Sequence, residues 1–361
     1  MKVMTVLGTR PEIIRLSRIV PTLDDMCDHV LVHTGQNFDR TLNELFFEEL
    51  GLRCPDHMLE SKADTAMEQI GAILRGCERT IEQEKPDRLL ILGDTNSALS
   101  AIVAKRMGIP VYHMEAGNRC YDDRVPEELN RRIVDHSSDI LLPYTERSRA
   151  NLLREGIAGE RIYVTGNPIY EVIDFYSSQI KASRALEKFG LSAGDFFLIT
   201  LHRADNVDVP ERLSHFFNAF RLLYEEYRIP LICSLHPRTR SQLMKQGIIM
   251  EESWFLGVEP LGFFDFVNLE RQAKCVLTDS GTVQEESCIF NTPSVILRDV
   301  TERPETLEAG STMLSGAEPE SVLECVNWVL KHSRDWNPPQ EYMVRNVADT
   351  VVKIVMGYYR R

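Results

Sequence analysis

The sequence predicts an α/β protein made of two doubly wound domains. Short apolar runs alternate with longer amphipathic segments along most of the chain, which is the pattern of parallel strands joined by helices. Several of the runs end at Gly, Asp or His. A chain of 361 residues is long enough for two domains of medium size. We therefore expect two sheets, each with helices on both faces.

In the first part of the chain, strands are expected at the apolar runs and helices at the segments between them. Pro11 suits the first position of a helix after the first strand. The expected strands cover residues 3–7, 29–33, 89–92, 111–114, 140–144 and 162–168. The other expected helices cover residues 42–50, 65–84, 98–107 and 147–155.

A second domain of the same kind is expected to follow. Residues 170–189 read as a charged helical segment near the domain boundary. Further strands are expected at residues 196–201, 230–235, 275–278 and 295–297, and a final amphipathic helix at residues 342–359. We therefore predict domains at residues 1–170 and 171–340 and a separate C-terminal segment at residues 341–361.

The composition indicates a globular protein that binds neither nucleic acid nor membranes. Hydrophobic residues make up 43% of the chain, which is sufficient for ordinary cores. A net charge of −13 argues against non-specific binding to nucleic acid, and the apolar runs are far shorter than a membrane span. The eight cysteines include no Cys-x-x-Cys pair, so we expect reduced thiols in the cytoplasm, without a metal site or disulfides.

The strongest functional signal lies between residues 89 and 135. Asp94 and Glu115 each follow an expected strand, at the carboxyl end where parallel sheets bind their ligands. Glu127–Glu128 follows, and Arg131 lies one helical turn further on. Asp94 alone is better explained as a helix cap than as a catalytic residue. Three acidic positions together indicate an acid–base site, because neighbouring carboxylates push each other's pKa values apart.

Basic side chains follow other expected strands and indicate a site for anions. His202 and His236 each follow a strand, and each has an arginine close behind it. A single histidine in such a place is often structural, but two His-Arg clusters favour anion binding. Arg10 lies beside a helix N-terminus, where anions bind, although it is equally compatible with an exposed arginine.

The turn after residues 275–278 has the composition of a phosphate site. Ser280, Gly281 and Thr282 open a helix, so their backbone N–H groups can reach a phosphate. Glu286 lies one turn further along, in a position suited to ribose hydroxyls. An aromatic-rich segment that includes Phe266 is mostly core, although one ring can stack on a base. The sequence thus predicts a nucleotide-bound substrate in a cleft between the two domains.

Taken in order, these motifs resemble those of the non-hydrolysing UDP-N-acetylglucosamine 2-epimerase family. The match extends from the first strand to about residue 310. Each motif is weak by itself, whereas the ordered set is highly specific. The motifs are Gly8–Glu12, Gly93–Thr95, Glu115–Gly117, Pro126–Glu128 with Asn130–Arg131, Gly166–Asn167, Asp279–Gly281 with Glu285–Glu286, and Thr301–Glu305.

The resemblance implies a fold, a quaternary structure and a reaction. It implies the GT-B fold of two Rossmann-like domains with an interdomain cleft, a last helix that packs back on the first domain, and a homodimer. The implied reaction inverts C2 of a UDP-N-acetylhexosamine without a cofactor. UDP is eliminated to leave a 2-acetamidoglycal and then adds back after protonation on the other face.

The resemblance also implies roles for individual residues. Asp94, Glu115 and Glu127 match the family's acid–base carboxylates, and His202 matches the histidine that faces the departing pyrophosphate. Arg131 is implied to hold a carboxylate or phosphate. Phosphate, ribose, uracil and sugar contacts are implied for Arg10, Phe266, Ser280, Gly281, Thr282, Glu286 and Arg303, with Thr282 standing where the family often has glycine.

Other features leave the exact substrate open. Arg15 stands where UDP-GlcNAc enzymes usually have lysine, and residues 35–39 replace the stretch that holds an activating UDP-GlcNAc in many members. Residues 117–120 and 124–126 look more like the branch that makes UDP-N-acetyl-L-fucosamine from the L-talo precursor for capsule or O-antigen. The family default, UDP-GlcNAc to UDP-ManNAc, stands beside it. A hydrolysing epimerase, a glycosyltransferase of the same fold and a nucleotide-sugar sensor are the rivals.

Overall fold

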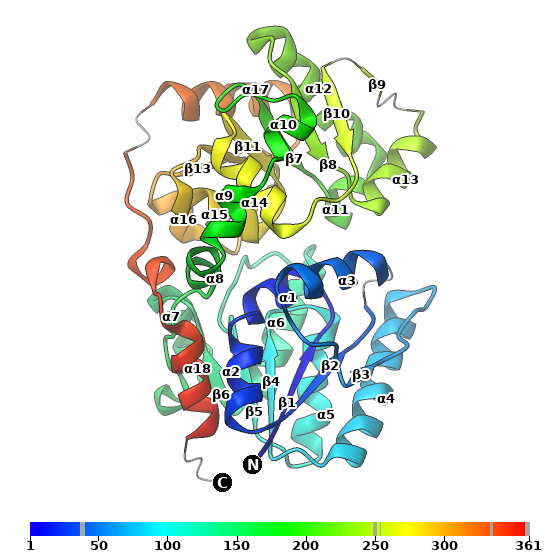
Figure 1. Cartoon of the computed structure of the whole chain (residues 1–361), viewed down its shortest axis with the longest axis vertical. Helices are drawn as coiled ribbons and strands as arrows, with labels where there is room; N and C mark the ends of the chain where they lie inside the picture. The colour runs from blue at the N-terminus through cyan, green and yellow to red at the C-terminus, as the bar shows by residue number, and fades with distance from the viewer. Residues whose placement is uncertain (37–39, 248–250, 253, 333–334, 358–361) are drawn as a thin grey trace. The chain divides into compact units, whose positions relative to one another are not determined.

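The computed structural model describes residues 1–36, 40–247, 251–252, 254–332 and 335–357. The chain divides into two compact units, which are both visible in Figure 1. Unit 1 comprises Met1–Phe175 and Gln340–Arg361, and unit 2 comprises Tyr176–Pro339. Residues 37–39, on which the prediction about an activating ligand partly rests, lie outside the described residues. Within the described residues, no helix combines the length and hydropathy needed to cross a bilayer.

A six-stranded parallel sheet forms the centre of unit 1, in the order β3-β2-β1-β4-β5-β6. The central strands are buried on both faces, which explains their near-continuous apolar sequences. The strands are β1 (Lys2–Leu7), β2 (Asp28–His33), β3 (His57–Met58), β4 (Arg88–Leu92), β5 (Val111–Met114) and β6 (Ile140–Leu142).

Helices cover this sheet, and their buried faces pack on alternate residues of the strands. On α4, Ile73, Cys77 and Ile81 lie in one core cluster with Val6 and Ile91 of the sheet. The helices of unit 1 are α1 (Arg10–Leu16), α2 (Ile19–Met26), α3 (Arg40–Glu49), α4 (Ala66–Glu84), η1 (Asn96–Leu99), α5 (Ser100–Arg106), α6 (Pro126–Ser137), α7 (Glu146–Arg154), η2 (Gly159–Arg161), α8 (Ile169–Phe175), η3 (Gln340–Met343) and α18 (Val347–Met356).

The last described helix, α18, belongs to unit 1 although unit 2 separates it from the rest of that unit in sequence. It packs beside α2, as Figure 1 shows. Its buried residues Val347, Val351 and Val355 lie on one face, because they recur every four residues. The backbone carbonyl of Val355 also accepts a hydrogen bond from Arg88 at the start of β4.

Unit 2 contains a seven-stranded sheet in the order β13-β12-β11-β7-β8-β10-β9. Six of its strands are parallel, and the short edge strand β9 pairs antiparallel with β10. The strands are β7 (Phe197–Thr200), β8 (Leu231–Ser234), β9 (Glu251–Glu252), β10 (Phe255–Val258), β11 (Cys275–Thr278), β12 (Ser294–Ile296) and β13 (Thr312–Leu314).

Two separate core clusters show that this sheet is covered on both faces. Ile199 and Leu277 face α12 and α17, whereas their chain neighbours Leu198 and Val276 face α10, α14 and α15. The helices of unit 2 are α9 (Ser177–Ala182), α10 (Ala185–Phe189), α11 (Ala204–Val207), α12 (Pro210–Tyr227), α13 (Pro237–Lys245), α14 (Phe263–Gln272), α15 (Gly281–Phe290), α16 (Pro304–Glu308) and α17 (Pro319–Lys331).

Some elements differ from the sequence-based expectations. Residues 162–168 form no strand, because only Ile162 makes a single bridge to β6. The charged segment 170–189 is broken into α8, α9 and α10. The final helix is shorter than predicted, since α18 begins at Val347 and ends at Met356. The short strands β3, β9, β10 and β13 were not expected.

The two sheets share one topology. Counting the six parallel strands of each unit along the chain, both sheets have the order 3-2-1-4-5-6. In this arrangement the strand order reverses between the first and fourth strands, and ligands bind beyond the carboxyl ends of those strands. These switch points lie between β1 and β4 in unit 1 and between β7 and β11 in unit 2.

Candidate active site

At the switch point of unit 1, Glu12 joins the loops that follow β1 and β4. Its carboxylate accepts the backbone N–H of Gly8 at 2.6 Å and of Thr9 at 2.8 Å, and it accepts the hydroxyl of Thr95 at 2.7 Å. Burial raises the pKa of Glu12 to about 7 despite these donors. The sequence motif contained Glu12, but its bridging role depends on a partner 83 residues away.

Asp94 follows β4, and its carboxylate lies 2.7 Å from Nε of Arg131 on α6. Its backbone carbonyl accepts the side-chain amide of Asn130 at 2.9 Å. The helix-cap alternative for Asp94 is wrong, because Thr95 occupies the N-cap of η1 and accepts the N–H of Ser97. The side chain of Asp94 is 21% exposed to solvent, so a ligand can still reach it.

Glu115 lies at the end of β5 in an unusual backbone conformation. Its φ is 65°, in the left-handed region that a residue with a side chain rarely adopts. Its carboxylate pairs with the buried guanidinium of Arg15, and Asn118 donates to it at 3.4 Å. Strain of this kind persists where surrounding contacts enforce it, and it concentrates at functional sites.

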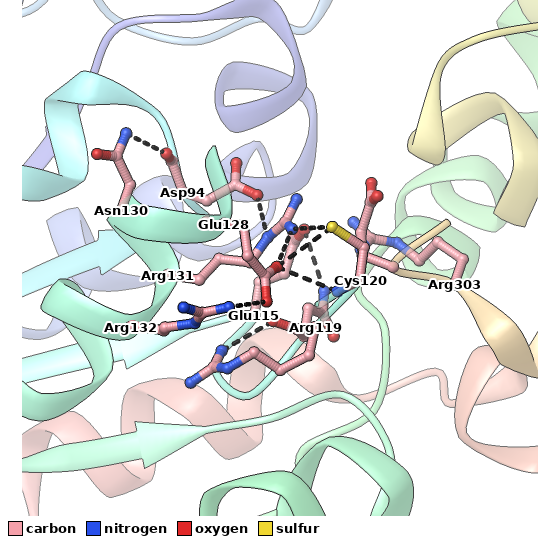
Figure 2. A network of polar contacts seen from close by, with 12 residues as sticks. Asp94, Glu115, Arg119, Cys120, Glu128, Asn130, Arg131, Arg132 and Arg303 are labelled. Atoms are coloured by element: carbon pink, nitrogen blue, oxygen red, sulfur yellow. Dashed lines mark hydrogen bonds and ion pairs between the residues drawn. The ribbon is translucent and has the colours of Figure 1, made fainter. Parts of the chain in front are cut away.

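The two glutamates at the start of α6 have different environments. Glu127 is half-buried, whereas Glu128 is fully buried. Glu128 accepts the backbone N–H groups of Cys120 at 3.0 Å and Tyr121 at 3.1 Å, and Arg131 lies 2.8 Å away. Burial opposes ionisation, but these donors outweigh it and lower the pKa of Glu128. Figure 2 shows this carboxylate beside Cys120 and Arg131.

Buried polar side chains connect the ends of β4 and β5 to α6. His113 on β5 lies 2.9 Å from Asp135 through Nδ1 and 2.9 Å from the Gly93 carbonyl through Nε2. Asp135 also accepts the N–H of Gly117 at 3.1 Å and pairs with Arg119 at 2.8 Å. These contacts link the turns before Asp94 and after Glu115 to α6, although neither His113 nor Asp135 was singled out from the sequence.

In unit 2, Asp279 organises the corresponding switch point. It is fully buried and accepts the backbone N–H groups of His202 at 3.0 Å and Arg203 at 2.9 Å. Its carboxylate also lies 3.1 Å from Nδ1 of His202. Burial opposes ionisation, but the His202 ring and these N–H donors outweigh it and lower the pKa of Asp279 to about 2. His202 is thereby oriented while its side chain stays 41% exposed.

The second predicted histidine, His236, has a structural contact. Its ring lies 6.2 Å from that of His202, so the structure does bring the two histidines together. His236 is also the N-cap of α13, where Nδ1 accepts the N–H of Arg238 at 3.2 Å. This contact favours the structural alternative for His236 without excluding a ligand at its other nitrogen.

The turn before α15 has the form of an anion site. Ser280 is the N-cap without a side-chain cap hydrogen bond, and Ser280, Gly281 and Thr282 are half-buried. A Cβ on Gly281 would lie 2.8 Å from a carboxylate oxygen of Glu302. The first turn of this ten-residue helix therefore retains N–H groups for an anion.

The remaining predicted ligands of unit 2 lie on neighbouring elements. Glu286 on α15 is nearly buried and lies beside the buried Glu270 of α14, which accepts the hydroxyl of Ser287 at 2.8 Å. Burial and the neighbouring Glu286 raise the pKa of Glu270 well above its ordinary value. Arg303 is buried and pairs with Glu285, and Phe266 is half-buried against the core cluster on its face of the sheet.

Arg10 is the first residue of α1, where its guanidinium lies 5.9 Å from the centre of the Phe46 ring. Among the predicted residues, Asp94 and Arg131 contact each other in unit 1, and His202 and His236 lie side by side in unit 2. Within the described residues, no group of three or more His, Cys, Asp or Glu side chains is arranged to hold a metal ion.

A model of the UDP-N-acetylglucosamine 2-epimerase family matches residues 22–356 of the chain. The chain belongs to this family. The UDP-N-acetylglucosamine 2-epimerase of Methanococcus maripaludis is 38% identical over 364 residues, which cover 99% of this chain and 98% of that protein. The UDP-2,3-diacetamido-2,3-dideoxy-D-glucuronate 2-epimerase of Pseudomonas aeruginosa is 36% identical, over 90% of this chain and 91% of that protein.

Solved structures of the family are also similar to this chain. The Methanocaldococcus jannaschii UDP-GlcNAc 2-epimerase, in complex with UDP-GlcNAc and UDP, aligns with a TM-score of 0.93 at 39% identity, covering 98% of this chain and 99% of that one. The predicted family and GT-B type of α/β fold are confirmed. The fucosamine-forming branch stays a prediction.

Proposed function

We propose that the protein is a non-hydrolysing epimerase that interconverts UDP-GlcNAc and UDP-ManNAc. The observation that supports this most is the set of carboxylates at the switch point of unit 1. Asp94 and Glu115 end neighbouring strands, and each is held by a buried arginine. Proton transfer at carbon needs carboxylates in fixed positions, and inversion needs such groups on both faces of C2.

In the proposed mechanism, one carboxylate among Asp94, Glu115 and Glu127 takes the C2 proton while the C1–O bond breaks. UDP leaves with the electron pair of that bond, and a double bond forms between C1 and C2 of the sugar. A second carboxylate then delivers a proton to the opposite face of C2 as UDP adds back to C1. The sequence is redox-neutral, so atoms and electrons balance without an oxidant.

The side chains of unit 2 suit the leaving group in this proposal. His202, which Asp279 orients, and the N–H groups at the start of α15 would stabilise negative charge on the departing pyrophosphate. Glu286 would accept ribose hydroxyls, and Phe266 would pack on uracil. Arg10, Arg303 and His236 would supply further phosphate or sugar contacts.

The experiment that tests this proposal is proton NMR of the protein with UDP-GlcNAc in D2O. We expect deuterium at C2 together with UDP-ManNAc. Free ManNAc and UDP would instead identify a hydrolysing epimerase, and sugar transfer to an added acceptor would identify a glycosyltransferase. An absence of C2 exchange would overturn the assignment of UDP-GlcNAc. The 6-deoxy-L-talo sugar nucleotide and UDP-2,3-diacetamido-2,3-dideoxy-D-glucuronate would then be tested in the same way.

We also propose that the protein is a cytoplasmic homodimer. The eight cysteines all carry free thiols, which is typical of a reducing compartment. The dimer follows from the family resemblance. Sedimentation equilibrium would test it, because a species of 41.4 kDa would identify a monomer.

A further inference from the structure

Arg131 bridges two carboxylates inside unit 1 (Figure 2). Its Nε lies 2.7 Å from Asp94, and its Nη1 lies 2.8 Å from Glu128. Only 3% of Arg131 is exposed. The resemblance to the family implied that this arginine holds a carboxylate or phosphate of the substrate, but it already pairs with two carboxylates of the protein.

Glu128 is anchored more firmly than Asp94. It is fully buried, and its two oxygens accept the N–H groups of Cys120 and Tyr121. Tyr121 has a φ of 56°, so Glu128 helps to hold a strained turn in place. The same donors that lower the pKa of Glu128 favour a permanent negative charge there. Glu128 is therefore a fixed anion, whereas the partly exposed Asp94 can exchange a proton.

This asymmetry matters when Asp94 gains or loses a proton. A buried guanidinium without a negative partner is strongly unfavourable. When Asp94 is protonated, Arg131 still has the charge of Glu128 beside it, so the cation stays compensated. When Asp94 is ionised, the Arg131 guanidinium serves both carboxylates, so the attraction that holds Asp94 in its ionised form is shared. Arg132, which lies 3.4 Å from the other oxygen of Glu128, compensates part of the Glu128 charge.

The other charged groups around Asp94 are themselves paired. Glu115, which follows β5, lies near the turn before Asp94, because its Oε2 is 4.0 Å from the place of a Cβ on Gly93, and this carboxylate pairs with Arg15 of α1. Glu12 of α1 reaches the same loop through the hydroxyl of Thr95. The contacts from Asn130 of α6 are neutral. Arg131 contacts Asp94 directly, and Glu128 competes with Asp94 for the same guanidinium.

We propose that Arg131 and Glu128 are positioning residues that hold Asp94 and set how readily it exchanges the C2 proton, and that Arg131 does not bind the substrate. This inference rests on the proposed epimerase function. It assigns opposite electrostatic effects to the two residues, because Arg131 stabilises the ionised form of Asp94 and Glu128 weakens that effect.

The test compares the pH dependence of kcat/KM in the Arg131→Gln and Glu128→Gln variants, measured by C2 deuterium exchange of UDP-GlcNAc. We expect the limb of the pH profile that reports the pKa of Asp94 to move to higher pH by about one unit in Arg131→Gln. The same limb should move to lower pH by about half a unit in Glu128→Gln. In both variants kcat should fall more than KM changes, because neither side chain contacts the substrate.

The controls are Arg149→Gln and Glu146→Gln on α7, which make the same charge changes at exposed positions and should leave the profile unchanged. UDP binding, measured on every variant, reports folding. If Arg131→Gln does not fold, Arg131→Lys replaces it, because lysine keeps the charge but lacks the guanidinium fork that joins both carboxylates. We then expect kcat to fall at least about tenfold.

The proposal would be overturned if this limb of the pH profile stayed in place in both variants or moved in the same direction in both. It would also be overturned if the loss of kcat/KM appeared mainly as a change in KM. A wild-type protein that exchanges no C2 hydrogen would overturn the proposed function, and this inference with it. The two failures are distinguishable, because only the second appears in the unmodified protein.

Discussion

The switch points of the two units have the same strand order and opposite chemistry. In unit 1 the ends of β4 and β5 carry carboxylates, and buried arginines hold them in place. In unit 2 the buried carboxylate of Asp279 accepts backbone N–H groups and orients His202, and the N–H groups of α15 remain for an anion. The shared topology therefore fixes where a ligand binds, and the side chains at the strand ends decide what is done to it.

This contrast separates two tasks that mutations should affect independently. Changes at the end of β4 should affect proton transfer and leave nucleotide affinity intact. Changes at the end of β11 should affect nucleotide affinity, or the stability of unit 2, and leave the proton-transfer groups in place.

Asp94→Asn should have the largest effect, since it removes a proton-transfer group while keeping its size. We expect kcat to fall by about 10³-fold, with UDP affinity unchanged by calorimetry. Asp174→Asn on α8, where the side chain is half exposed, is a matched control that should keep full activity. An equal loss of UDP affinity in Asp94→Asn would show that the two tasks are not separate.

Asp279→Asn should destabilise unit 2 by about 2 kcal/mol above pH 4. The pKa of Asp279 is lowered to about 2 in the folded protein, below its ordinary value. Its contribution to stability is therefore present above pH 4 and is lost as pH falls from about 4 to about 2. Urea unfolding of both proteins at pH 5 and at pH 2 would test this. A stability difference that does not shrink at low pH would contradict it.

Gly281→Ala should weaken UDP binding about tenfold, which corresponds to about 1.4 kcal/mol. The added Cβ would lie 2.8 Å from one carboxylate oxygen of Glu302. The other oxygen accepts a hydrogen bond from Arg298 at 2.7 Å, which holds the carboxylate in place, so the turn must shift. Gly71→Ala on α4 is the matched control, because its Cβ would meet no atom within 4 Å. Unchanged UDP affinity in Gly281→Ala would remove α15 from the nucleotide site.

Glu270→Gln should have the smallest effect, and only at high pH. Because the pKa of Glu270 is raised, its proton is present at low pH and is lost as pH rises through that value. The second negative charge would then disturb Glu286, and UDP affinity of the wild type should fall about threefold. The glutamine variant should show no such fall. If UDP affinity depended on pH in the same way in both proteins, this role of Glu270 would be excluded.

Much of the fold was predictable because buried parallel strands have continuous apolar sequences. The runs at β1 and β4 are of this kind, and both were predicted. The strands that were missed are short or lie towards the sheet edges, such as β3 with two residues and β10 with a partly exposed pattern. The strand predicted at the start of residues 162–168 is reduced to one bridge at Ile162, although the N–H groups of Tyr163 and Thr165 still donate to the carbonyls of Leu141 and Pro143.

The candidate site was predictable only where local position defines it. Asp94 and Glu115 could be placed because each follows a strand. Glu12 forms a local capping box with Thr9, but its contact with Thr95 depends on folding, and so do the contacts of Glu128 with the N–H groups of Cys120 and Tyr121. The same holds for Arg131, since nothing in its local sequence distinguishes a ligand of the substrate from a partner of Asp94.

The placement of α18 has a consequence for biosynthesis. Residues 340–356 complete unit 1, yet they leave the ribosome after all of unit 2. During translation the whole sequence of unit 2 is available before α18 emerges, so the residues of α2 that α18 contacts lack that partner until then. Chains usually fold from the N-terminal domain onward. Here the synthesis of unit 1 begins first and ends last. A nascent chain stalled before residue 340 would therefore contain a complete unit 2 and an unfinished unit 1.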